Sequence, residues 1–200
     1  MNMSEYIKTG FADLDNKISG LRKGSLILLG ARPGNGRMAF VECIARSITS
    51  DFGRSDSVLL FTDKHYQDNK VFKIIKTDNS PNLIDTIQSQ ALVYNTKLII
   101  TNFKAPVDLS AMQRLASKLN IPIMVVICLP VKHSGDEDEI IRPTLVELRE
   151  TVRNLDKSNI VMCIHRPKFE SLFLELEVLK NSFGKTTTTG LLLNEDYFKH

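Results

Sequence analysis

The chain has 200 residues, of which 42% are hydrophobic, so it is long enough for one good-sized core, and no second composition zone is visible. Its 26 basic and 23 acidic residues leave a formal net charge of +3, too small to indicate nucleic-acid binding from charge alone. Cys43, Cys128 and Cys163 lie far apart in apolar runs, which indicates neither a disulfide framework nor a paired-cysteine metal site. We therefore expect one α/β domain over residues 1–200, in a soluble cytoplasmic protein without a signal segment or membrane span.

Short apolar runs alternate with helix-length segments, a rhythm typical of β-α units packed around a mainly parallel sheet. Strands are predicted at Ser25–Gly30, Ser57–Thr62, Val71–Lys76, Lys97–Thr101, Ile121–Ile127 and Ile160–Ile164. Helices are predicted at Ala39–Ser50, Pro81–Asn95, Asp108–Leu119 and Leu145–Asn154. Two last strands, Ser171–Leu179 and Thr187–Leu193, predict a C-terminal β-hairpin with a glycine-containing turn.

A phosphate-binding loop pattern lies between the first predicted strand and helix, the context that such a loop requires. Its residues are Ala31, Arg32, Pro33, Gly34, Asn35, Gly36, Arg37 and Met38. The glycines allow backbone N–H groups to curl around phosphates, but the lysine that normally follows is Arg37 and the hydroxyl that normally holds magnesium is Met38. A thioether is a poor ligand for a hard cation. The segment therefore predicts a degenerate Walker A loop that requires no cofactor and binds ATP or ADP weakly at most.

Further segments follow in order along the chain: Thr9–Asp15, Ser19–Leu21 and Gly24–Leu29 before the loop, then Leu115–Pro122, Arg142–Glu150, His165–Pro167, Lys180–Gly184 and Tyr197–Phe198. In this order they resemble the C-terminal motor domain of DnaB-type replicative DNA helicases. The resemblance implies a RecA-like P-loop NTPase fold, with a mainly parallel central sheet flanked by helices. It also implies that the relatives use ATP and act in DNA replication.

The chain departs from that family at the positions that carry the chemistry. The resemblance places Lys64 where the family has its catalytic glutamate, and Thr101, followed by Asn102, where the Walker B aspartate holds magnesium. It places Cys128 at the glutamine that senses the γ-phosphate, and Ser182 at the arginine finger offered to the neighbouring subunit. A lost finger alone costs on the order of 10³-fold in rate in related NTPases. With Arg37 and Met38 these changes predict a domain that does not hydrolyse ATP.

Three functions stay open from the sequence. The first is an ATPase-dead pseudoenzyme that acts as a binding or regulatory module in replication or in a mobile element. The second is an active or slow ATP-dependent helicase motor, because a shift of one residue in the alignment would bring Asp63 to the position of the catalytic glutamate. The third is a nucleotide sensor that binds through the loop amides without turnover.

The expected partners follow from the same resemblance. DNA binding is expected to be weak or absent. Of the two loops that face DNA in the family, the first is cut to Phe103–Val107 here, and the second contains the acidic run Asp136–Glu139, which would repel a phosphate backbone. The expected partner is therefore a protein rather than DNA, and the replication machinery is the candidate source. The ring-forming N-terminal domain and linker are not in this sequence, so a monomer or dimer is expected rather than a hexamer, without a membrane contact. His165–Arg166 is interpreted as polar capping at the sheet edge, or as a remnant nucleotide contact.

Overall fold

The computed structural model describes residues 5–53, 57–66, 71–77, 82–103, 108–133, 140–168, 171–194 and 197–199. One large sheet dominates, with the strand order β11-β10-β9-β8-β3-β7-β6-β4-β5. Its parallel strands are β3 (Leu26–Ala31), β4 (Val58–Thr62), β5 (Lys73–Lys76), β6 (Leu98–Asn102), β7 (Ile123–Cys128) and β8 (Ile160–His165). Three antiparallel strands extend one side: β9 (Phe173–Asn181), β10 (Thr187–Asn194) and β11 (Tyr197–Lys199).

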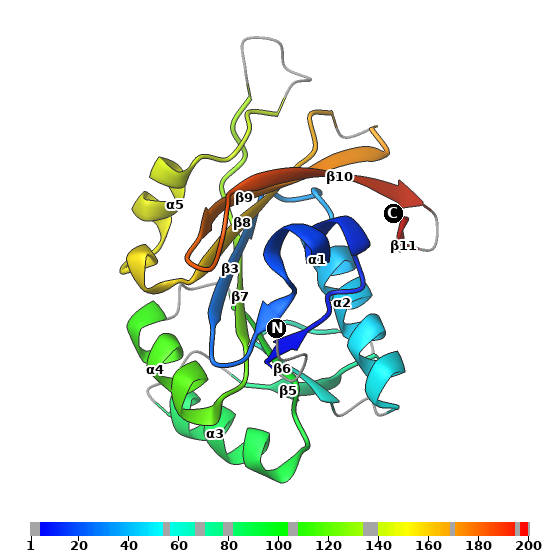
Figure 1. Ribbon diagram of the computed structural model, residues 1–200. Helices are drawn as coiled ribbons and strands as arrows, with labels where there is room; N and C mark the ends of the chain where they lie inside the picture. The colour runs from blue at the N-terminus through cyan, green and yellow to red at the C-terminus, as the bar shows by residue number, and fades with distance from the viewer. Residues whose placement is uncertain are drawn as a thin grey trace.

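Helices cover both faces of this sheet (Figure 1). One face carries α1 (Ala12–Ile18) and α2 (Arg37–Phe52). The other carries α3 (Leu83–Val93), α4 (Leu109–Leu119) and α5 (Leu145–Thr151), followed by the short 3₁₀ helix η2 (Leu155–Lys157). The sheet therefore separates two apolar cores. Within the described residues no helix has the length and apolar character needed to cross a membrane.

The central strand β3 shows why the chain adopts this layered fold. All its side chains are buried, and they alternate between the two cores: Ile27 and Leu29 face α1 and α2, whereas Leu26 and Leu28 face α3, α4 and α5. A strand buried on both faces reads as a continuous apolar run, as this one does. Because β3 is flanked by β7 on one side and β8 on the other, the loop that leaves it opens at the middle of the sheet.

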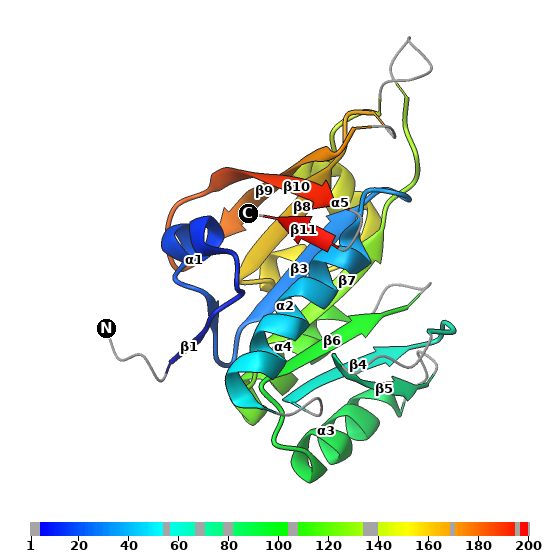
Figure 2. The ribbon, with the colours of Figure 1, turned by 90° about the vertical axis from the view of Figure 1, so that its right-hand side faces the viewer.

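The predicted strands and helices are confirmed, with shifted ends. Leu145–Asn154 was expected as one helix, but α5 stops at Thr151 because Val152 is extended (φ −126°, ψ 137°). Asn154 then adopts a left-handed conformation (φ 59°), which turns the chain into η2. The hairpin of β9 and β10 is also confirmed and continues the sheet beyond β8 (Figure 2). Pro81, the expected first residue of the second helix, lies outside the described residues.

Short elements before β3 are not recognisable from periodicity. Strands β1 (Tyr6–Ile7) and β2 (Leu21–Arg22) form a two-stranded ribbon that encloses α1. In the first turn of α1, the carboxylate of Asp15 accepts hydrogen bonds from the Thr9 backbone N–H (2.9 Å) and from the Thr9 hydroxyl (2.8 Å). At its end Gly20 has φ +82°, and a Cβ there would lie 2.6 Å from the Ile7 carbonyl oxygen. The spacing of polar and glycine residues in this segment therefore serves a tight turn rather than chemistry.

Candidate functional site

The loop after β3 has the backbone shape that its glycines predict. Gly34 (φ 77°) and Gly36 (φ 74°) are left-handed, and the Asn35 N–H donates to the Arg32 carbonyl (3.2 Å). Helix α2 begins at Arg37, directly after Gly36, with no acidic residue in its first turn. A helix start of this kind attracts negative charge. The local backbone therefore retains the form of a phosphate-binding loop.

The buried side chain of Arg32 anchors the start of the loop in the protein interior. Its side chain is fully buried and pairs in a bidentate manner with the Glu147 carboxylate, at 2.8 and 2.9 Å. The same guanidinium donates to the Ile141 carbonyl (2.7 Å) and to the Pro130 carbonyl. It thus joins β3, the segment after β7 and α5. Arg32 therefore connects the loop entrance with two distant parts of the chain.

Glu147 is charged in this arrangement. Burial by itself raises the pKa of the Glu147 carboxyl, but the Arg32 guanidinium and the Lys132 ammonium, 3.4 Å away, outweigh burial and lower it. The Glu147 backbone N–H also donates a hydrogen bond to the hydroxyl oxygen of Thr144, the N-cap residue of α5 (3.2 Å). A buried, ionised and bidentate pair is therefore part of the base of the loop.

Arg166 holds the loop from its exposed side. It donates to the Gly34 carbonyl (3.2 Å) and to the Ser171 carbonyl (2.7 Å), so it connects the loop with the chain that follows β8. The neighbouring His165 is buried at the end of β8. Because Arg166 contacts the loop itself, polar capping and a remnant nucleotide contact both stay predictions for His165–Arg166.

A hydrogen-bonded group of four side chains, here called the Asn102 cluster, lies beside the loop. It consists of Met38, Lys64, Tyr66 and Asn102. The Asn102 Oδ1 accepts from Lys64 Nζ (3.3 Å), while its Nδ2 donates to Met38 Sδ (3.2 Å) and to Tyr66 Oη. Both hydrogens of one amide and one of its acceptor positions are thus used within the cluster. Residues from α2, from the segment after β4 and from the end of β6 meet there.

Tyr66 is neutral in this cluster. Burial raises the pKa of its hydroxyl, and the carboxylates of Glu42 and Asp63 act in the same direction. The positive charge of Arg37 lowers it, which places Arg37 close to the cluster. The Arg37 Nε is itself buried and makes no hydrogen bond within the described residues. Basic and amide groups therefore surround the position next to Met38.

These residues do not fit a magnesium ion. Mg²⁺ requires a near-octahedral set of oxygen ligands. The cluster offers a thioether, an amide whose oxygen already accepts from an ammonium, and the positive charge of Lys64. No group of three or more His, Cys, Asp or Glu side chains able to hold a metal occurs among the described residues.

The other predicted positions do not gather at the cluster. Thr101 is buried on the opposite face of β6, and its hydroxyl makes no hydrogen bond in the described part of the chain. Of the two residues that end β6, Asn102 is the one that reaches the loop. Cys128 lies exposed at the end of β7, in register with Ala31. Ser182 lies at the opposite edge of the sheet, where its N–H donates to Asn159.

Sequence reasoning missed Tyr66 and Glu147 as residues of this site. Tyr66 follows a strand without any periodic pattern, so the sequence carries no signal for it. Glu147 had a signal, because it belongs to the Arg142–Glu150 segment that resembles the family, but nothing in the spacing pairs it with Arg32. Lys180 donates to the carbonyls of Asp156 and Ser158, both at 2.7 Å.

Thiol reactivity distinguishes the cysteines. Burial raises the pKa of Cys163 to about 12, whereas Cys128 is exposed. Because the thiolate is the reactive form, we expect a chromogenic disulfide reagent at pH 8 to modify Cys128 in the folded protein and to spare Cys163. Mass spectrometry of the labelled protein locates the adducts. The expectation fails if the Cys128→Ser variant is labelled as fast as the wild type, or if Cys163 reacts in the folded protein.

Comparison with known proteins agrees with this geometry. The model of the family "DnaB-like helicase C terminal domain" matches residues 6–98. The replicative DNA helicase DnaB of Mycoplasma pneumoniae is 24% identical over 82% of the chain and 47% of its own length. That of Helicobacter pylori is 44% identical over 22% of the chain and 9% of its own length. The chain thus spans about half the length of the first of these relatives.

Solved structures share the fold. A DnaB-like replicative helicase, solved in a study of its interactions with primase, superimposes with a TM-score of 0.75 at 15% identity, over 96% of this chain and 60% of the helicase. The RadB recombinase gives a TM-score of 0.67 at 13% identity, over 96% of this chain and 97% of the recombinase. The fold is therefore RecA-like, as expected. In sequence and in fold the chain is similar to the C-terminal domain of DnaB-like replicative helicases.

Proposed function

We propose that this domain is a DnaB-like pseudoenzyme, a binding or regulatory module of DNA replication that does not hydrolyse ATP. The observation that carries the proposal is the Asn102 cluster. Its amide, ammonium and thioether satisfy one another where phosphoryl transfer needs a magnesium ion and a general base. Lys64 is a cation at neutral pH and cannot activate water as a base.

Hydrolysis is the direct test of this proposal. We expect phosphate release from MgATP, with or without single-stranded DNA, to be no faster for the wild type than for Arg37→Ala. Arg46→Ala serves as the control for charge, since Arg46 is exposed further along the same helix. Turnover that DNA stimulates and that Arg37→Ala abolishes, while Arg46→Ala retains it, would establish the active motor instead.

Nucleotide binding without turnover is a second candidate, favoured by the backbone of the loop. Gly34 and Gly36 keep left-handed conformations at the start of α2, and Arg37 adds positive charge there. Binding would be weak and independent of Mg²⁺. A calorimetric titration with ATP and ADP, with and without Mg²⁺ and with Arg37→Ala alongside, decides between this candidate and a loop kept only for its shape.

The partner proposed for this module is a protein of the replication machinery, since a structural neighbour was solved with primase as its subject. DNA binding is proposed to be weak or absent. For the described residues the loop face offers Arg37, Lys64 and Arg166, and Arg166 is already engaged by backbone carbonyls. A monomer or dimer is proposed for this chain, and light scattering that gives a hexamer would contradict it.

A further inference from the structure

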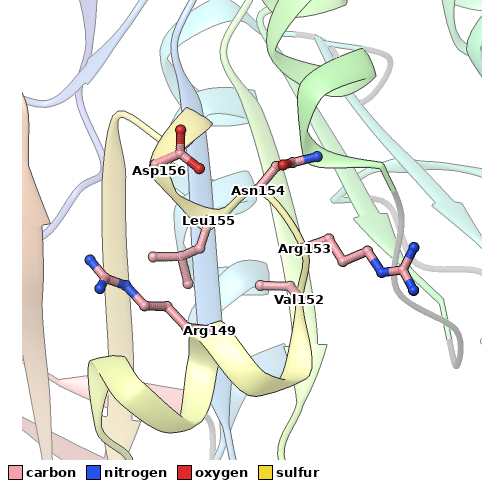
Figure 3. A pocket seen from close by; sticks show the side chains of 6 residues that line it. All are labelled: Arg149, Val152, Arg153, Asn154, Leu155 and Asp156. Carbon is pink, nitrogen blue, oxygen red and sulfur yellow. The ribbon is translucent and has the colours of Figure 1, made fainter.

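A pocket far from the loop is formed where α5 ends and η2 begins (Figure 3). It has a volume of about 600 Å³. Its lining residues are Arg149, Val152, Arg153, Asn154, Leu155 and Asp156. The chain runs from η2 into β8 through Ser158 and Asn159. The Asn159 N–H donates to the carbonyl of Leu26, at the start of β3 (2.8 Å). The pocket therefore lies at the edge of the sheet opposite to the loop after β3.

The backbone explains why this pocket exists. The helix stops at Thr151, Asn154 turns the chain with φ 59°, and η2 follows at once. Val152 and Leu155 are held in the core by this reversal, each only 3% exposed. Arg149 and Arg153 remain exposed on either side of them. Short turns with a fixed shape are typical positions for recognition on a rigid scaffold.

The two arginines are not used by the fold. Neither makes an ion pair or hydrogen bond to another group in the described ranges, whereas Asp156 has Lys157 within 3.7 Å. Their guanidinium groups project to opposite sides of Val152 and Leu155 (Figure 3). One small anion cannot bridge guanidinium groups that diverge in this way. A ligand with separated negative groups matches them better.

Lys180 adds positive charge to one side of the pocket. Its ammonium is held by the carbonyls of Asp156 and Ser158, both at 2.7 Å. Burial lowers the pKa of this ammonium, the Asp156 carboxylate raises it, and the positive charge of Arg149 lowers it further. Arg149 and Lys180 therefore repel each other, and an anion bound at Arg149 would relieve that repulsion.

We propose that this pocket docks an acidic segment of a protein partner, with carboxylates on Arg149 and Arg153 and a small apolar side chain between them. Charge complementarity identifies the occupant. Asp156 and Glu150 place negative charge at the same turn. A protein segment is favoured over nucleic acid because it can face these carboxylates with an uncharged residue, whereas a nucleic-acid backbone carries a negative charge at every nucleotide. The proposal extends the binding role suggested above, but it concerns another surface and does not depend on the loop.

The test measures binding of a fluorescein-labelled Asp-Glu-Leu-Asp-Glu peptide to the full chain by fluorescence anisotropy. We expect saturable binding at low salt that weakens about tenfold or more in the double variant Arg149→Gln/Arg153→Gln, since both charge-assisted contacts are lost. The control Lys8→Gln/Lys73→Gln removes the same charge at exposed positions of β5 and of the segment before α1, and it is expected to bind within about twofold of the wild type. On binding, the pKa of Lys180 is expected to rise, as followed by NMR.

Several outcomes would overturn the proposal. These are no saturable binding of the acidic peptide, equal binding of the neutral Asn-Gln-Leu-Asn-Gln peptide, or an equal loss in the control variant. Displacement by millimolar inorganic phosphate would indicate a simple anion site, and preference for a single-stranded oligonucleotide would indicate nucleic acid. ATP hydrolysis by the same preparation is measured separately, so failure of this proposal and failure of the pseudoenzyme proposal remain distinguishable.

Discussion

Replacement of Glu147 by glutamine is expected to lower the free energy of unfolding by about 3–5 kcal/mol, because it leaves the buried Arg32 guanidinium without its counterion. Glutamine keeps the size of the side chain, so the loss reports charge and bidentate pairing rather than a cavity. Urea denaturation followed by circular dichroism measures it. A loss of less than about 1 kcal/mol, the usual value for an exposed pair, would mean that the pair does not hold the loop.

Glu150→Gln is the matched control, since Glu150 is exposed on the same helix. It is expected to change stability by no more than about 0.5 kcal/mol. The double variant Arg32→Met/Glu147→Leu removes both charges and is expected to recover part of the loss, because no uncompensated charge stays buried. If the double variant is as unstable as Glu147→Gln, packing rather than the unpaired charge explains the loss.

The same pair makes the protein sensitive to acid. The pKa of Glu147 is lower in the folded protein than its ordinary value, so the unfolded state binds the proton more readily. Its contribution to stability is therefore complete above the ordinary glutamate pKa, about 4.3, and is lost as pH falls through the lower folded value. The wild type should lose more stability in this range than Glu147→Gln.

Asn102→Leu is expected to cost about 1–3 kcal/mol, because it removes the shared partner of Lys64, Tyr66 and Met38 while keeping the volume of the side chain. The half-buried Tyr66 hydroxyl loses this donor, and the Lys64 ammonium loses this acceptor. Thermal and urea unfolding of the variant measure the effect.

Asn95→Leu is the matched control, because it removes the same kind of asparagine–lysine hydrogen bond at a solvent-exposed position. Asn95 Oδ1 accepts from Lys97 Nζ at 2.9 Å, but both groups are exposed. Its loss is expected to stay within about 0.5 kcal/mol. Equal effects of the two variants would contradict the view that the buried Asn102 amide stabilises the protein through its hydrogen bonds.

The fold was largely predictable from the sequence, because strands such as β3 and β7 are continuous apolar runs and the helices between them have apolar residues at helical spacing. Element ends were less certain. The stop of α5 at Thr151 depends on Val152 and Leu155 entering the core, which no local pattern indicates. The short ribbon of β1 and β2 likewise depends on Ile7 and Leu21, which lie in the core shared with α1 and α2.

The sequence by itself determined the glycine loop and its place between β3 and α2. It also carries the resemblance from which replaced catalytic positions are predicted. Tertiary structure alone decided which side chains meet. The alternation of β6 directs Asn102 toward the loop and Thr101 away from it, and the end of β4 brings Lys64 and Tyr66 to the same amide. Arg32 and Glu147 lie 115 positions apart along the chain. Such pairings depend on how separate elements pack, which spacing along the chain does not encode.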